Sequence, residues 1–155
     1  MIIALGCDHA GYPLKKLVQD WLGKKGHQVL NLGVDTDAVP ADYPDYALAV
    51  SEAVASGKAE RGVVVCGSGV GATIAVNKVP GVRGCMCHDT FSARQGVEDD
   101  DMNVLCLGGR IIGQELAYEV LNAFLNAKFS GLDRHKRRKD KVTAIERTYS
   151  KEAVK

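Results

Sequence analysis

Residues 62–71 read Gly-Val-Val-Val-Cys-Gly-Ser-Gly-Val-Gly, a short apolar run that ends directly in a glycine-rich turn. Three consecutive valines predict a strand that is buried on both of its faces. The residues after the turn predict a helix that runs to about residue 78. Buried strands that are joined by helices are typical of a parallel sheet, so this stretch indicates an α/β fold.

The rest of the chain repeats the same alternation on either side of this stretch. We expect further strands over residues 2–6, 27–32, 82–87 and 104–107, and further helices over residues 13–25, 43–57, 89–95 and 113–128. The pattern predicts a three-layer αβα, Rossmann-like domain with a five-stranded, doubly wound parallel sheet and right-handed crossovers. Ligands of such folds bind at the carboxyl ends of the strands.

Composition favours an ordinary globular enzyme or binding protein. The chain has 155 residues, 46% of them hydrophobic and 25% charged, with a net charge of +1. These values argue against a disordered chain, and no apolar run is long enough to span a membrane. We therefore expect one domain over residues 1–155, with a core over 1–130 and a tail over 131–155. The amino-terminal residues lack the basic leader of a signal peptide, so we expect a cytoplasmic protein with no membrane partner.

Charge is distributed unevenly along the chain. Residues 134–155 hold nine Lys and Arg and three acidic residues, a net charge of +6, and we expect this tail to be helical. Arg134 and Arg138 lie four residues apart, so on a helix they share a face and can grip one phosphate. A solvated helix face explains the charge equally well. No nucleic-acid-binding motif accompanies the tail, so we expect no nucleic-acid partner.

The glycine turn brings a thiol beside several backbone amides. The N–H groups of Gly67, Gly69, Val70 and Gly71 can approach an anion, and the start of the following helix favours the thiolate form of Cys66. The spacing matches neither a dinucleotide-binding fingerprint nor a P-loop, and Ser68 is not in a nucleophile elbow. A purely structural strand–helix turn remains an alternative.

Two further clusters carry polar chemistry. Asp8 and His9 follow the first strand, where they can bind hydroxyl groups or transfer protons, or merely cap a helix. Residues 98–101 read Glu-Asp-Asp-Asp, a run that can share a proton or bind a cation, or be a solvated acidic loop. The five cysteines, with no secretion signal, argue against a disulfide framework and favour buried reduced thiols. Cys85, Cys87 and His88 lack the second pair of ligands of a zinc site, so we expect no metal.

Taken together, these residues resemble the type B ribose-5-phosphate isomerases and the related galactose-6-phosphate isomerase subunits. The likeness covers residues 2 to about 146. The motifs that carry it are Gly6-Cys7-Asp8-His9-Ala10-Gly11, Asp42-Tyr43-Pro44, Cys66-Gly67-Ser68-Gly69-Val70-Gly71, Ala75-x-Asn77-Lys78, Asn103-Val104-Leu105, Gly113 and Arg134-His135-x-x-Arg138.

The resemblance implies an aldose–ketose isomerase of sugar phosphates that uses no metal or cofactor. It further implies a homodimer or homotetramer with active sites at the subunit interface. Cys66 would be the base that moves a proton between C1 and C2, beside the Ser68 hydroxyl and the loop amides. The substrate contacts would come from Asp8, His9, Asp100, Arg110, Arg134, His135 and Arg138.

One position departs from the family pattern. Asp99 stands where the family usually has the His that helps to open the sugar ring, and Asp100 stands where an Asn is usual. Asp99 can carry the same proton, the substrate can be a tetrose phosphate that forms no furanose, or ring opening can be impaired. Ribose 5-phosphate is the expected substrate; another tetrose or hexose phosphate, or a non-catalytic phosphosugar-binding protein, is the alternative.

Overall fold

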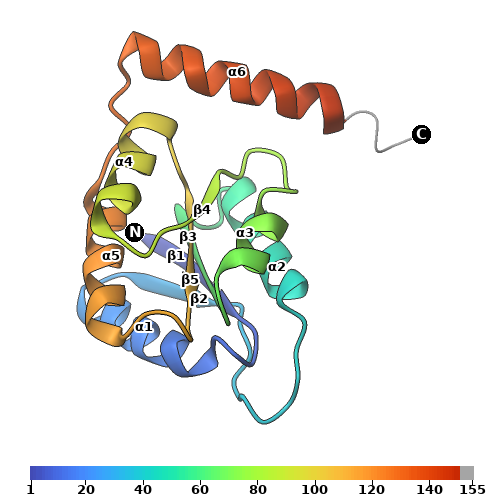
Figure 1. Cartoon of the computed structure of the whole chain (residues 1–155), viewed down its shortest axis with the longest axis vertical. Helices are drawn as coiled ribbons and strands as arrows, with labels where there is room; N and C mark the ends of the chain where they lie inside the picture. Colours follow the sequence, from blue (N-terminus) through green and yellow to red (C-terminus); the bar gives the residue numbers. More distant parts are fainter. Residues whose placement is uncertain (151–155) are drawn as a thin grey trace.

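A five-stranded parallel sheet lies between two layers of helices in the computed structural model, which describes residues 1–150 (Figure 1). The elements are β1 (Ile2–Cys7), α1 (Tyr12–Lys24), β2 (Gln28–Asn31), α2 (Tyr43–Ala55), β3 (Arg61–Cys66), α3 (Val70–Val76), β4 (Gly84–Met86), α4 (Thr90–Asp100), β5 (Val104–Gly108), α5 (Gln114–Asn126) and α6 (Asp133–Ser150). The strand order is β2-β1-β3-β5-β4. The predicted αβα, Rossmann-like fold is therefore confirmed.

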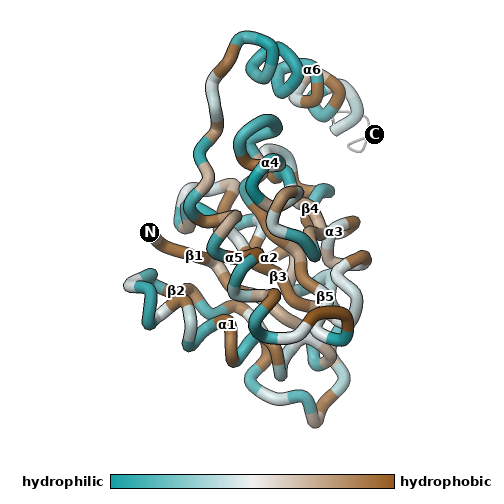
Figure 2. The backbone as a smooth tube through the Cα atoms, turned by 60° about the vertical axis from the view of Figure 1, so that its left-hand side comes forward, coloured by the Kyte–Doolittle hydropathy of each residue, from teal (hydrophilic) through white to brown (hydrophobic). Residues whose placement is uncertain are grey.

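The core has two halves, one on each face of the sheet. Side chains of α1, α4 and α5 pack with Leu5, Val63 and Leu105 on one face, and side chains of α2 and α3 pack with Ala4 and Val64 on the other. The alternation along each strand produces this division, because successive side chains point to opposite faces. Figure 2 shows the strands mostly in brown, whereas α6 is largely hydrophilic.

The order of the strands places a crevice at one edge of the sheet. The chain passes from β1 to β2 on one side and then returns to β3 on the other side of β1. Such a reversal leaves the loops after the two central strands diverging, which is where open α/β sheets bind ligands. The loops that begin at Asp8 and Gly67 follow these two strands.

Two predicted elements differ from the observed ones. Strand β4 has three residues instead of the six expected, because it pairs only with β5, from Gly84 to Met86. Helix α4 was expected to end near residue 95 but continues to Asp100, so residues 98–100 of the acidic run are helical and not a loop, one of the alternatives that the sequence left open. Bonds from Arg94 to Glu98 and from Gln95 to Asp99 link successive turns of this helix and stabilise it.

The basic tail forms α6, which lies beyond the end of α4 and away from the sheet (Figure 1). Its last predicted residues, 151–155, lie outside the described part of the chain. Among residues 1–150, no helix has both the length and the apolar character that crossing a bilayer requires.

Candidate active site

Cys66 is the last residue of β3 and is almost completely buried. The Gly69 N–H donates a hydrogen bond to its Sγ atom over 3.2 Å. The φ angle of Gly69 is +84°, and a Cβ atom there would lie 3.1 Å from the backbone of Leu107. Only glycine allows both this conformation and this approach to β5, so the turn holds an amide against the sulfur.

The remainder of the turn faces the crevice. Ser68 is exposed, and its Oγ accepts a hydrogen bond from the Val70 N–H over 3.3 Å. Gly71 lies against the ring of Tyr43, because a Cβ atom on Gly71 would be 2.7 Å from that ring. Tyr43 was not among the predicted site residues, although it belongs to the Asp42-Tyr43-Pro44 motif and begins α2.

The loop after β1 packs directly against the loop after β3. An added Cβ on Gly11 would lie 2.0 Å from the Val65 carbonyl oxygen, and one on Gly67 would lie 3.6 Å from Ala10. Asp8 is buried, and its Oδ1 accepts a hydrogen bond from the Gly11 N–H over 2.8 Å. This bond closes the turn between β1 and α1; it does not cap the helix, whose N-cap is Gly11 and has no side-chain capping bond.

His9 lies at the same edge and is held by the segment before α2. Its Nδ1 lies 3.0 Å from the amide nitrogen and 3.1 Å from the carbonyl oxygen of Ala41. The Ala41 N–H donates to Nδ1, so the neutral ring carries its proton on Nε2. His9 can therefore donate a hydrogen bond to a substrate hydroxyl.

Arg110 is the one predicted arginine that the fold brings to this crevice. Its N–H donates to the Gly67 carbonyl over 3.0 Å, and its Nη1 would lie 3.7 Å from a Cβ on Gly67. The loop after β5 therefore places a guanidinium beside the glycine turn. We call Asp8, His9, Cys66, Ser68, Arg110 and the amides of residues 67–71 the Cys66 group.

Another residue at this edge was considered only as part of a zinc pattern. His88 follows β4, and its Nε2 accepts a hydrogen bond from the Gly108 N–H over 3.0 Å. Burial lowers the pKa of His88, which favours the neutral ring that this bond requires. His88 therefore joins the ends of β4 and β5.

The other predicted residues form a second cluster. His135 is buried; its Nδ1 lies 2.7 Å from Ser130 Oγ and 3.5 Å from Asp99 Oδ1, and its Nε2 accepts from Arg134 Nε over 3.0 Å. Arg138 lies one turn further along α6 and is exposed. We call Asp99, Asp100, Arg134, His135 and Arg138 the α6 group.

Within one chain the two groups lie at opposite ends of the sheet. Cys66 pairs with Gly108 at the end of β5, whereas Asp99 and Asp100 precede Val104, which begins β5 beside Gly62. Five residues of strand span roughly 15 Å. A single copy therefore cannot bring the Cys66 thiol and the α6 group to the same small substrate.

The thiols of the described chain differ in their protonation. All five cysteines are unpaired, and of these only Cys85 is exposed. Burial raises the pKa of Cys7 to about 11 and that of Cys106 to about 12. A hydrogen bond from Cys87 lowers the pKa of Cys85 to about 7. Residues 1–150 contain no cluster of three His, Cys, Asp or Glu arranged to hold a metal ion.

Comparison with known proteins gives a consistent result. The family model described as Ribose/Galactose Isomerase matches residues 3–142. Ribose-5-phosphate isomerase B of Escherichia coli is 41% identical over 144 residues, which cover 93% of this chain and 95% of that protein. D-erythrulose-4-phosphate isomerase of Pectobacterium atrosepticum is also 41% identical, over 129 residues that cover 83% of this chain and 85% of that protein.

Solved structures agree with the computed one. Ribose-5-phosphate isomerase B of Clostridium thermocellum superposes with a TM-score of 0.93 at 44% identity, covering 96% of this chain and 99% of that one. A Mycoplasma genitalium ribose-5-phosphate isomerase B with bound ribulose 5-phosphate gives a TM-score of 0.88 at 35% identity, covering 94% of this chain and 96% of that one.

Proposed function

The chain belongs to the ribose/galactose isomerase family, and we propose that it interconverts ribose 5-phosphate and ribulose 5-phosphate with Cys66 as the base. The observation that carries this proposal is the sulfur of Cys66 at the carboxyl end of β3, with a backbone amide 3.2 Å away. A base and oriented N–H donors are what an enediolate mechanism requires.

The proton transfer uses the Cys66 group. The Cys66 thiolate removes the proton from C2 of the open-chain aldose, and the C2–H electron pair forms the C1–C2 double bond of an enediolate. Negative charge develops on the oxygen at C1, where the amides of residues 67–71 donate hydrogen bonds to it. The Cys66 thiol then gives a proton to C1, the O1 oxyanion takes up a proton and O2–H loses one, which gives the ketose. Exchange of the thiol proton with solvent before this step brings solvent hydrogen into the sugar. Ser68 and His9 supply hydroxyl and imidazole groups for the exchange between the two oxygens.

The phosphate and the sugar ring need groups from a second copy of the chain. Arg110 alone among the arginines proposed for the site lies beside Cys66 in its own copy. We propose a homodimer, or a tetramer built from such dimers, in which the α6 group of one copy completes the Cys66 group of the other. Each site then holds three arginines for one phosphate.

Exposed apolar side chains support this assembly. Val70 and Ile74 on α3 are 48% and 59% exposed, and Val142 and Ile145 on α6 are 56% and 60% exposed. A cavity of about 910 Å³ lies between α6 and the body of its own subunit. Exposed apolar patches beside a groove of this size are typical of surfaces that bind another protein, and α3 of a second copy carries the complementary apolar face.

A four-carbon sugar phosphate is the second candidate substrate. Asp99 replaces the imidazole that we associate with ring opening, and a relative with 41% identity is named as a D-erythrulose-4-phosphate isomerase. A tetrose 4-phosphate forms no furanose because its O4 carries the phosphate. Such a substrate would not need the missing imidazole.

The test is turnover of both sugar phosphates by the purified protein at neutral pH with a chelator present. We expect conversion of ribose 5-phosphate with uptake of solvent deuterium into the sugar. Cys66→Ala should abolish turnover and leave ligand binding intact, whereas Cys106→Ala, which also removes a buried thiol, should retain it. Substantial turnover by Cys66→Ala would refute the assigned base.

Two other outcomes are informative. Turnover of erythrulose 4-phosphate alone would assign the four-carbon substrate. Saturable binding without deuterium exchange on any of these sugars would instead identify a non-catalytic phosphosugar-binding protein, and would overturn the proposed function.

A further inference from the structure

Asp101 follows the last residue of α4 in an unusual backbone conformation. Its φ angle is +55°, and among residues 1–150 it is the one non-glycine residue with a positive φ. Its N–H donates to the Val97 carbonyl over 3.2 Å, which closes the helix. Glycine adopts this conformation at lower cost, and Asp and Asn adopt it more readily than other side chains do.

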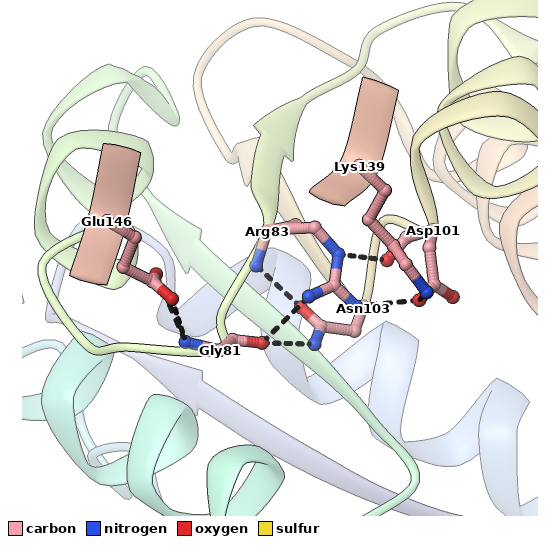
Figure 3. Close-up of polar contacts among 6 residues, drawn as sticks. All are labelled: Gly81, Arg83, Asp101, Asn103, Lys139 and Glu146. Carbon is pink, nitrogen blue, oxygen red and sulfur yellow. Dashed lines mark hydrogen bonds and ion pairs between the residues drawn. The ribbon is translucent and has the colours of Figure 1, made fainter. Parts of the chain in front are cut away.

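The Asp101 side chain joins three segments of the chain (Figure 3). Its Oδ2 atom accepts hydrogen bonds from Arg83 Nη2 over 3.0 Å and from Lys139 Nζ over 3.2 Å. Arg83 Nε also donates to the Asp101 carbonyl over 2.7 Å. The three side chains are 28%, 27% and 34% exposed for Arg83, Lys139 and Asp101, so solvent screens them less than it screens a fully exposed pair.

A second set of hydrogen bonds joins the segment around Gly81 and Arg83 to α6. Asn103 accepts from the Arg83 N–H over 2.8 Å and donates to the Gly81 carbonyl over 2.9 Å. The Gly81 N–H in turn donates to both carboxylate oxygens of Glu146 over 3.1 Å (Figure 3). Lys139 and Glu146 are seven residues apart, two turns of α6, and therefore lie on one face of that helix.

The position of these bonds relates them to the α6 group. Asp99 lies two residues before Asp101, and His135 lies one helical turn before Lys139 on the same face of α6. The Lys139–Asp101 bond thus lies beside the contact of His135 with Asp99. It fixes the end of α4 against the segment that carries Arg134 and Arg138.

We propose that Asp101, together with Arg83 and Lys139, positions the α6 group so that Asp99, Arg134 and Arg138 meet one substrate in a single arrangement. This inference rests on the proposed function. None of the three residues needs to touch the substrate, because they act by holding α4 and α6 together. Misplacing groups that bind and orient a substrate by about 1 Å can lower activity about a hundredfold.

The test compares Lys139→Met with Lys141→Met in the full-length protein. Both variants remove one positive charge from α6, but Lys141 is exposed and makes no contact with Asp101. We expect Lys139→Met to raise KM for the sugar phosphate and the inhibition constant of inorganic phosphate about tenfold, with a smaller fall in kcat. Lys139→Arg, which can still donate to Asp101, should restore both constants to within about twofold of the wild type.

Asp101→Asn separates the charge from the backbone conformation, since Asn tolerates a positive φ well. We expect it to shift KM and the phosphate inhibition constant in the same direction as Lys139→Met, at an unchanged unfolding midpoint. Equal constants for Lys139→Met and Lys141→Met would overturn the inference while the wild type remains an isomerase. A wild type that isomerises no sugar phosphate would overturn the proposed function itself.

Discussion

Asp99 lies near the end of α4, at the position that our proposal connects with opening of the sugar ring. Its carboxylate accepts a hydrogen bond from Gln95 and lies 3.5 Å from the buried imidazole of His135. A carboxylate adds negative charge near the arginines and is a weaker proton donor at neutral pH than an imidazole. If the proposed site is right, the residue at position 99 should affect how well cyclic sugars are processed.

Asp99→His should increase turnover of ribose 5-phosphate, because the imidazole can donate a proton to the ring oxygen at neutral pH. We expect a gain of about tenfold or more in kcat, within the range of general acid catalysis. The measurement is the initial rate on ribose 5-phosphate beside that on erythrulose 4-phosphate, which needs no ring opening and should respond little. An Asp99→His variant that is no faster on ribose 5-phosphate would contradict this role.

Cys85 should be alkylated before the buried thiols. With a pKa of about 7, the thiolate fraction of Cys85 decreases as the pH falls below 7. Cys7 and Cys106, with pKa values of about 11 and 12, stay protonated until far higher pH. Peptide mapping after a brief iodoacetamide pulse between pH 6 and pH 8 should show labelling of Cys85 that rises with pH. Preferential labelling of Cys7 or Cys106 would be inconsistent with this assignment.

The elements show where sequence patterns were informative and where they were not. The valines of β3 predicted a strand that is buried on both faces. They are buried because β1 and β5 flank the strand and helices cover both faces of the sheet. The run at residues 98–101 has the composition of a loop. However, Met102 packs on Gly96 and its N–H donates to the Gly96 carbonyl, which stabilises the last turn of α4. Tertiary contacts of this kind have no local signal, so element ends were predicted less well than elements.

Gly11 and Gly23 give a matched pair of tests at the two ends of α1. Gly11 has a right-handed backbone, so Ala is excluded there by space alone, since its Cβ would lie 2.0 Å from the Val65 oxygen. Gly11→Ala should lower the free energy of unfolding by about 3 kcal/mol or more.

Nothing lies within 4 Å of a Cβ added to Gly23. Gly23→Ala should raise the free energy of unfolding by about 0.5–1 kcal/mol, because Ala loses less conformational entropy in a helix. Urea denaturation of both variants measures the two effects. We expect the two changes in the free energy of unfolding to have opposite signs. A Gly11→Ala variant as stable as the wild type would show that the loop after β1 can move away from β3.

At the scale of the whole molecule, a general rule predicted that the residues of the Cys66 group would lie together, and the structure places them at one edge of the sheet. Residues at the carboxyl ends of parallel strands meet at one edge of a sheet; Cys66 ends β3, and Asp8 and Arg110 come shortly after β1 and β5. No comparable rule places the α6 group. Its distance from Cys66 depends on where α6 lies, which local periodicity does not encode.

Two inactive variants should restore activity when they are combined in one oligomer. Co-expression of Cys66→Ala with Arg134→Met/Arg138→Met should give roughly a quarter of wild-type activity, because half of randomly paired dimers are mixed and each has one intact site. Separately tagged subunits allow the mixed dimers to be isolated and assayed.

The matched control combines Cys66→Ala with Arg110→Met. Both changes fall in the Cys66 group, so every site of the mixed dimer stays defective and no activity should return. Activity of the mixed dimers in this control would contradict a site that is shared between copies. Absence of activity in the first combination would contradict it as well.

The two outer strands of the sheet are also its shortest. β2 has four residues and β4 has three, compared with five or six in the central strands. Short edges offer few unpaired backbone groups to another sheet, which is how natural β-structures limit aggregation. The sheet edges therefore favour self-association less than the helix surfaces do, and the proposed dimer would form through side chains, which can select a partner, and not through backbone pairing, which is not selective.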